Sequence, residues 1–300
     1  MKGVTELSFR TVFIESRCRC SYKGGYLVVR KENGTAKIHL SEIAIIVLET
    51  TQIFISAYLL AELAKQKIPL VVSDEKHNPV GEYLPIYGAH NTSKRIQEQI
   101  AWSEPSKKRL WQRVVRDKIY QQELVLRYAL CDEVADKLKT YHLEVRSGDT
   151  TNREAAAACL YFESLFGEGF SRAYDTPVNA SLNYGYAILL SRVNREIVAR
   201  GYFTQVGICH RNEYNPFNLS CDFMEPFRPI VDRLVIDNLF DEFSPEIRKI
   251  LADMMNVRVS YRGGIYKLGS VVSQYVQDCL NVLNKNIEAS DISSFVWRNE

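Results

Sequence analysis

The spacing of apolar residues changes near Tyr87, and this change limits the fold more than any other feature of the chain. Before it, short alternating runs separated by glycine turns are typical of β-hairpins. From about Ala89 onward, apolar residues recur with helical spacing, and strands are hard to find. A chain of 300 residues is long enough for two domains. The sequence therefore predicts an α+β fold, with a β-rich N-terminal domain over residues 1–90 and a larger all-α C-terminal domain over residues 91–300.

Several elements can be placed within this frame. Turn residues at Gly24-Gly25 and Asn33-Gly34 predict two hairpins. Ser103 before Pro105 predicts the start of a long, basic helix. The domain boundary is expected between residues 85 and 95. The other expected elements are strands over residues 19–30, 35–40 and 68–72, a helix over 52–66 and a loop over 76–81.

Composition and charge narrow the class of protein. Hydrophobic residues make up 46% and charged residues 25%, as in ordinary globular proteins. Residues 1–10 lack the apolar core of a signal peptide, and Glu49 and Glu62 interrupt the best membrane-span candidate, residues 43–63. The 7 scattered cysteines predict reduced thiols in the cytoplasm, and no membrane association is expected. Because the net charge is only +2, a DNA site would require local clustering of basic residues.

The first segment that could carry chemistry is a helix expected between Thr151 and the stop residue Gly167. Glu154 lies in its first turn and shares a face with the small Ala158, which leaves room for a metal ion beside the helix. A structural interpretation competes with this one. Thr151 and Glu154 have the spacing of a capping box, in which the glutamate bonds back to the cap N–H. The local sequence leaves both roles open.

Two further segments supply a histidine and two carboxylates. His210 precedes a polar, turn-rich loop, and a neutral imidazole is a common metal ligand. Asp222 and Glu225 are three residues apart, so on a helix both would be within reach of one cation. Alternatively, they form an acidic first turn that matches the helix dipole, capped by Asn218 or Ser220. Pro226 is expected to kink or restart this helix, and Arg228 continues the same face.

Taken together, these segments resemble the core integrase family of CRISPR adaptation, and in particular the subfamily associated with type II systems. The most specific block is Asp222-x-Met224-Glu225-Pro226-Phe227-Arg228-Pro229, preceded by Gly207-x-x-His210. Other matching blocks lie at residues 152–155, 161–167, 179–187 and 218–219. Because their order also agrees, the resemblance covers essentially the whole chain.

The resemblance implies a metal-dependent DNA integrase and endonuclease that inserts short DNA duplexes into a CRISPR array in a prokaryotic cytoplasm. It implies that Glu154, His210 and Glu225 are the catalytic ligands of Mg²⁺ or Mn²⁺, with Asp222 as an auxiliary acid. Many relatives carry aspartate where this chain has Glu225. The resemblance also implies a homodimer, with the N-terminal domain in dimerisation, a small ferredoxin-like partner, and other type II CRISPR proteins as further candidates. A stand-alone nuclease acting on branched DNA and a non-catalytic DNA-binding scaffold remain the alternatives.

DNA contact could come from basic residues at three places. Arg109, Arg113 and Arg116 form one stripe of the long helix, flanked by Lys107, Lys108 and Lys118. The alternative is a solvated helix face. Arg192 and Arg195 form a second candidate group, and Arg228 could either orient Glu225 or contact phosphate.

Overall fold

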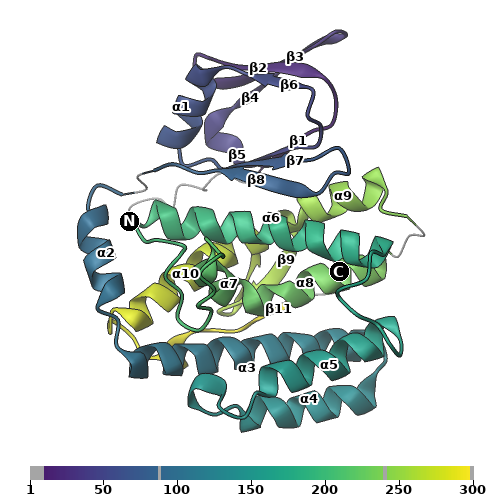
Figure 1. Cartoon of the computed structure of the whole chain (residues 1–300), viewed down its shortest axis with the longest axis vertical. Coiled ribbons are helices and arrows are strands. Elements are labelled where there is room, and N and C mark those ends of the chain that lie inside the picture. The colour runs from purple at the N-terminus through teal and green to yellow at the C-terminus, as the bar shows by residue number, and fades with distance from the viewer. Residues whose placement is uncertain (1–9, 87–88, 239–241, 298–300) are drawn as a thin grey trace.

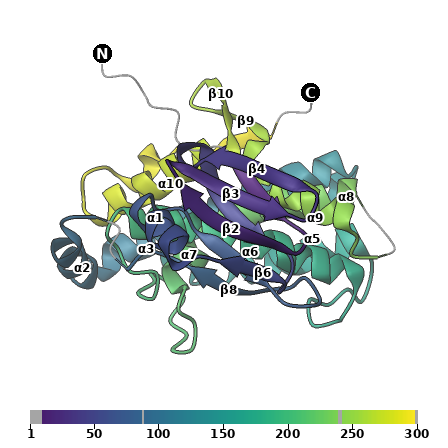
Figure 2. The same ribbon diagram turned by 90° about the horizontal axis from the view of Figure 1, so that it is seen from above.

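A computed structural model of the chain describes residues 10–86, 89–238 and 242–297 (Figure 1). The N-terminal region contains two four-stranded sheets. One has the order β4-β3-β2-β6, and its antiparallel strands β2, β3 and β4 follow the two hairpins expected from the sequence. Figure 2 looks down on this sheet, which covers part of the helical layer. Its strands are β2 (Cys18–Lys23), β3 (Tyr26–Lys31), β4 (Gly34–His39) and β6 (Ile53–Ile55).

The second sheet lies next to the helices and has the order β1-β5-β7-β8. Its first three strands run parallel, whereas β8 is antiparallel. All six residues of β5 are buried apolar residues, which is typical of a parallel strand covered on both faces. The strands are β1 (Arg10–Ile14), β5 (Ile43–Leu48), β7 (Leu70–Ser73) and β8 (Pro79–Tyr83).

The expected order, a β-rich region followed by a larger helical region, is confirmed. The helices of the second region are α2 (Thr92–Ile100), α3 (Glu104–Tyr128), α4 (Asp132–Glu144), α5 (Arg153–Phe166), α6 (Pro177–Ala199), α7 (Asn218–Met224), α8 (Arg228–Asp237), α9 (Pro245–Ala252) and α10 (Leu268–Leu283). Ser103 caps α3 as predicted, because its side chain accepts a hydrogen bond from Ser106 N. No helix in the described part of the chain is both long and apolar enough to cross a bilayer.

Helix α6 crosses the middle of the molecule, between the β1-β5-β7-β8 sheet and the helices below it (Figure 1). Gly185 permits its close approach to α8, because a Cβ atom at this position would lie 2.4 Å from Val231 Cγ1. The close packing of α6 against α8 therefore requires a glycine at this position.

Three local expectations were wrong. The helix expected over residues 52–66 is only α1 (Ala57–Lys65), because β6 takes up the residues before its cap, Ser56. The loop expected over residues 76–81 includes the start of β8. The helical region is not all-α, since it holds a small antiparallel sheet of β10 (Gly264–Lys267), β9 (Arg258–Tyr261) and β11 (Phe295–Trp297).

The expected domain boundary includes residues 87 and 88, which lie outside the described residues. The two regions are in close contact through buried polar groups. Glu49, at the end of β5, accepts a hydrogen bond from Tyr184 Oη of α6 (2.6 Å) and pairs with Arg248 Nε of α9 (2.9 Å). The division into two domains therefore stays a prediction.

Candidate active site

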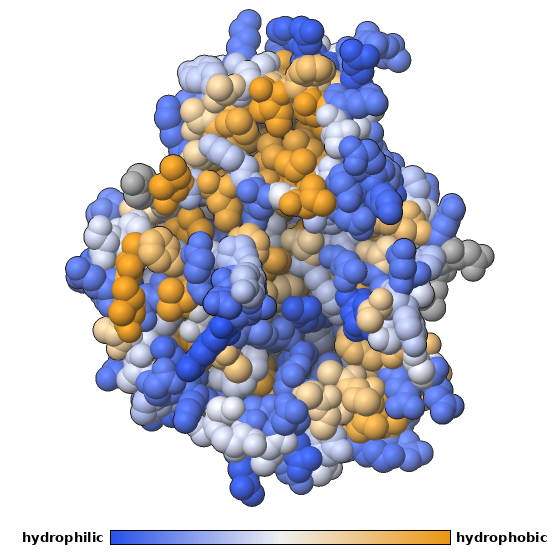
Figure 3. Space-filling model, viewed as in Figure 1, coloured by the Kyte–Doolittle hydropathy of each residue, from blue (hydrophilic) through white to orange (hydrophobic). Residues whose placement is uncertain are grey.

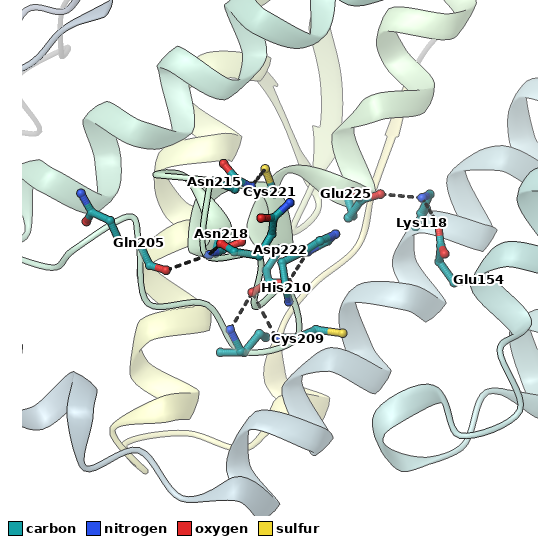
Figure 4. A network of polar contacts seen from close by, with 12 residues as sticks. Lys118, Glu154, Gln205, Cys209, His210, Asn215, Asn218, Cys221, Asp222 and Glu225 are labelled. Atoms are coloured by element: carbon teal, nitrogen blue, oxygen red, sulfur yellow. Dashed lines mark hydrogen bonds and ion pairs between the residues drawn. The ribbon is translucent and has the colours of Figure 1, made fainter. Parts of the chain in front are cut away.

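Three side chains from separate helical segments meet at one point of the helical region (Figure 4). Lys118 of α3 forms ion pairs with Glu154, in the first turn of α5, and with Glu225, in the short 3₁₀ segment Glu225–Phe227. The distance from Lys118 Nζ to Glu225 Oε2 is 2.5 Å. Lys118 and Glu225 are buried, with 8% and 5% exposure. From the sequence, Lys118 is expected beside a DNA-binding stripe, whereas the structure places it between two predicted metal ligands.

The start of α5 leaves the Glu154 side chain available for this contact. The N-cap position of α5 is Asn152, but the capping carboxylate comes from Asp149 and not from Thr151: it accepts hydrogen bonds from Arg153 N (2.9 Å) and Glu154 N (3.0 Å). Asn152 adopts a left-handed conformation, with φ of 52°, where the chain turns into the helix. The capping-box interpretation of Glu154 is therefore wrong, because its carboxylate points to Lys118 instead of its own backbone.

Pro226 separates α7 from α8 and sets the position of Glu225. As expected, the helix is interrupted here, by a single 3₁₀ turn between Met224 and Arg228. Arg228 Nε donates a hydrogen bond to Glu225 Oε1 (3.0 Å), so this arginine orients the glutamate. Burial alone would raise the pKa of Glu225, but Arg228 and Lys118 outweigh it and lower that pKa to about 2. Glu225 is therefore ionised at neutral pH.

His210 is held by Asp222, which is fully buried. Asp222 Oδ1 accepts from His210 N (3.1 Å) and lies 2.7 Å from His210 Nδ1, while Oδ2 accepts from Ile208 N (2.6 Å) and Cys209 N (3.2 Å). With Nδ1 protonated toward Asp222, Nε2 keeps its lone pair for a ligand. The hydrogen bond to Asp222 is the main reason why the pKa of His210 is raised.

These bonds correct the role expected for Asp222. Both of its oxygens are occupied by donors from the loop at residues 208–210, so it positions His210 instead of serving as a further ligand. The acidic-first-turn alternative is also wrong. Neither Asn218 nor Ser220 is the N-cap of α7, and the Asn218 amide donates to Gln205 O and Asn212 O (Figure 4).

A second buried network, missed by the sequence analysis, lies behind Arg228. Tyr161 Oη and Tyr186 Oη both donate hydrogen bonds to Asp232. Arg228 lies over the Tyr186 ring, 4.7 Å from its centroid. Burial raises the pKa of Asp232 to about 6, although the two tyrosine bonds and the nearby arginine act in the opposite direction. This network supports the arginine that orients Glu225.

The donor set suits a divalent cation. Two carboxylates converge on the single ammonium of Lys118. His210 and Glu225 are close enough to shift each other's pKa values. Within the described ranges, no group of three or more His, Cys, Asp or Glu side chains could hold a metal ion as the side chains now lie. A metal bound by all three predicted ligands would therefore require side-chain movement.

The arginines predicted to contact DNA differ in availability. Arg109 is exposed on α3. Arg113 is bound to Asp117 Oδ2 (2.9 Å) and Ser294 Oγ (2.8 Å), and Arg116 donates to Val145 O (3.1 Å). DNA contact by this stripe stays a prediction, for which Arg109 is the most accessible member.

The second arginine group predicted to contact DNA, Arg192 and Arg195, is bound to other parts of the protein. Arg192 is 4% exposed and donates to Gly269 O (2.9 Å), while Arg195 donates to Lys67 O (2.7 Å). Both also form ion pairs with Glu196, which is buried. Arg192 is therefore unavailable to phosphate, whereas DNA contact by the half-buried Arg195 stays a prediction.

Comparison with known proteins identifies the family. Residues 12–242, more than half of the chain, match the family model described as CRISPR associated protein Cas1. The chain belongs to the Cas1 family. A relative called CRISPR-associated endonuclease Cas1, from Neisseria meningitidis serogroup C (strain 8013), is 39% identical over 259 residues, which is 85% of each chain. The family resemblance drawn from the sequence blocks is thus confirmed.

Solved structures agree on the Cas1 fold. A structure described as a casposase bound to integration product has a TM-score of 0.74 at 18% identity, covering 93% of this chain and 92% of that chain. A Cas6-RT-Cas1--Cas2 complex has a TM-score of 0.73 at 19% identity, covering 95% of this chain and 36% of that chain. At such identities the likeness establishes the fold alone.

Proposed function

We propose that this Cas1 protein is a divalent-metal-dependent DNA integrase and endonuclease that inserts short duplexes into a CRISPR array. The observation that carries the proposal is the convergence of Glu154 and the ionised Glu225 on one cation, with the oriented imidazole of His210 nearby. Two carboxylates and one neutral imidazole suit Mn²⁺ well and Mg²⁺ acceptably. Their total charge of about −2 would neutralise the ion and leave positions open for DNA oxygens.

In the proposed reaction, a DNA 3′-oxygen forms a new bond to a backbone phosphorus while the bond from that phosphorus to another 3′-oxygen breaks. When bound, a divalent ion would activate the attacking hydroxyl and stabilise charge on the transferring phosphate. Glu154, His210 Nε2 and Glu225 would hold the ion. Arg228 keeps the Glu225 carboxylate in place, and Asp222 fixes the imidazole so that Nε2 points away from its own backbone.

Double-stranded DNA, a second copy of the chain and a small ferredoxin-like protein are the proposed partners, within a type II CRISPR system. The endonuclease name of the Neisseria relative and the integration product of the casposase support DNA as the substrate. The Cas1–Cas2 assembly in the second structure supports a small partner. Apolar side chains gather over the N-terminal sheets (Figure 3), and Phe54 and Tyr58 are each 60% exposed there, which supports dimerisation through that region.

The deciding experiment is strand transfer on a supercoiled plasmid that carries a CRISPR repeat, with labelled short duplexes and Mn²⁺ or Mg²⁺. Joined products with the wild-type protein, and none with Glu154→Gln, would support integration. Cleaved ends without joined DNA, with and without the small partner, would favour the stand-alone nuclease. Equal joining by wild type and Glu154→Gln would reject the assigned site.

A further inference from the structure

We infer that Lys118 is a tethered cation that holds the Glu154–Glu225 site together before metal binds, and that a divalent ion must displace it. This inference rests on the proposed function, since it concerns the same carboxylates. Lys118 Nζ makes ion pairs with both Glu154 and Glu225, the latter at 2.5 Å, and is therefore where these carboxylates converge (Figure 4).

The position of Lys118 in α3 explains why its side chain reaches the site. Trp111, Val115, Gln122 and Val125 of α3 are buried, and Lys118 falls on the same stripe at helical spacing. On this buried face, the ammonium group of Lys118 lies out of bulk water as the structure stands. It requires an anionic partner, and α5 and the Glu225 turn provide two.

The charges of this cluster are balanced as the structure stands. Glu154 and Glu225 contribute two negative charges, while Lys118 and Arg228 contribute two positive ones. Without Lys118, the two carboxylates would repel each other with only Arg228 to compensate them. Lys118 therefore explains how two ligand carboxylates can lie together without a metal ion.

Because these four charges already cancel, a divalent ion cannot bind to the two carboxylates without a change in the cluster. An ion at the carboxylates would leave two uncompensated positive charges, one of them on an ammonium already at the contact position. Movement of Lys118 out of the cluster would relieve the direct repulsion and free both carboxylates for the ion. An incoming DNA phosphate would then offset the remaining positive charge, so metal and DNA binding would reinforce each other.

The first test compares metal-stripped wild-type protein with Lys118→Met, which keeps an unbranched side chain of similar length and removes its charge. By calorimetry, Mn²⁺ should bind Lys118→Met at least about tenfold more tightly, because the competing cation is absent. In EDTA the variant should melt several degrees lower, and saturating Mn²⁺ should raise its Tm more than that of wild type. Lys108→Met, which removes an exposed lysine of the same helix, should match wild type in both measurements.

A second test needs no variant and therefore does not depend on the folding of Lys118→Met. Wild-type protein is treated with an amine-acetylating reagent in EDTA or in saturating Mn²⁺, and each lysine is quantified by mass spectrometry. Acetylation of Lys118 should rise several-fold with Mn²⁺, while that of exposed Lys108 stays constant. Unchanged Lys118 acetylation at proven Mn²⁺ saturation, or equal Mn²⁺ affinity in Lys118→Met and wild type, would overturn the inference. If wild type binds no Mn²⁺ through Glu154 and Glu225, the proposed function itself fails instead.

Discussion

At the scale of single residues, Asp222 contributes most to the arrangement of the site, because it fixes the loop and the ring of His210. It is fully buried and accepts hydrogen bonds from three backbone N–H groups while it orients the His210 ring. Such outer partners of a ligand fix both its tautomer and its direction.

Asp222→Asn should therefore weaken Mn²⁺ binding by about 10–100-fold without removing any proposed ligand. The asparagine NH₂ would face backbone donors, so part of the network at residues 208–210 would lose its acceptor. Calorimetry on metal-stripped protein measures the effect. Asp136→Asn, at an exposed ion pair with Arg127, is the matched control and should bind as wild type does. Wild-type affinity in Asp222→Asn would show that Asp222 does not position the ligand.

Glu196 supports the fold away from the site. Burial alone would raise its pKa, but Arg192, Arg200 and Arg195 outweigh burial and lower that pKa to about 2 from an ordinary 4.5. A carboxyl with a lowered folded-state pKa stabilises the protein above its unfolded pKa, and this stabilisation is lost as the pH falls toward the folded pKa.

Glu196→Gln should accordingly lower the free energy of unfolding at pH 7 by about 3–5 kcal/mol, because three arginines lose their counter-charge. Denaturant titration at several pH values measures this difference. The difference from wild type should shrink between pH 4.5 and about 2, where wild-type Glu196 becomes protonated. A difference that stays constant over this range would mean that the charge of Glu196 is not the cause.

The sequence predicts the residue types of the site better than their roles. The family blocks around Glu154, His210 and Glu225 mark those residues as ligands, and the structure brings the two glutamates together. The role of Lys118 was missed because its neighbours Lys107 and Lys108 suggested a basic surface. Its place on the buried stripe with Val115 and Gln122 was the available signal. Asp222 could not be assigned from sequence, since its partners are backbone groups that precede it by 12–14 residues.

At the scale of secondary-structure elements, the beginning of α5 decides where Glu154 points. The capping-box interpretation makes Thr151 the cap, whereas in the structure the capping carboxylate is that of Asp149, which accepts from Arg153 N and Glu154 N. The difference arises because Gly148 and Asn152 both adopt positive φ, so the chain doubles back before the helix. Spacing along the sequence does not encode that path.

The two candidate caps can be separated by mutation. Asp149→Ala should cost about 1 kcal/mol of stability, since two N–H groups of the first turn of α5 lose their acceptor. Thr151→Ala should cost less than about 0.5 kcal/mol, as an exposed substitution. Urea unfolding of both variants measures these values. A larger loss in Thr151→Ala than in Asp149→Ala would restore the capping-box interpretation.

Element types could be predicted where the periodicity of apolar residues extended over many positions. The predictions failed where the strands were short. The hairpin turns follow directly from Gly24-Gly25 and Asn33-Gly34, and the start of α3 follows from Ser103-Glu104-Pro105. The β9-β10-β11 sheet was missed, since its strands have only three or four residues and one of them, β11, is far from the others in sequence. Pairing across such a distance depends on tertiary packing and not on local pattern.

At the scale of the whole molecule, a buried polar cluster joins the N-terminal sheets to the helical region. Glu49 of the sheet region contacts Tyr184 and Arg248 of the helices, and His77 Nδ1 lies 3.2 Å from its carboxylate. The contacts with Tyr184 and Arg248 could not be read from the sequence, because these residues are more than 100 positions away from Glu49.

Glu49→Ala should destabilise the protein by about 3–5 kcal/mol, because Arg248 would be left buried without its counter-charge. Guanidinium unfolding, followed by tryptophan fluorescence, measures the loss. Glu42→Ala, at an exposed pair with Arg10, is the control and should change stability by less than about 1 kcal/mol. Equal stability of Glu49→Ala and Glu42→Ala would show that this cluster does not join the two regions.

The proposed function requires that Glu154, His210 and Glu225 together bind a single divalent ion. The most direct measurement is calorimetric titration of Mn²⁺ into metal-stripped wild type, Glu154→Gln, His210→Ala and Glu225→Gln, with circular dichroism to verify folding. We predict one site per chain in wild type, and affinity at least about tenfold weaker in each folded variant. Wild-type stoichiometry and affinity in all three variants would contradict the claim.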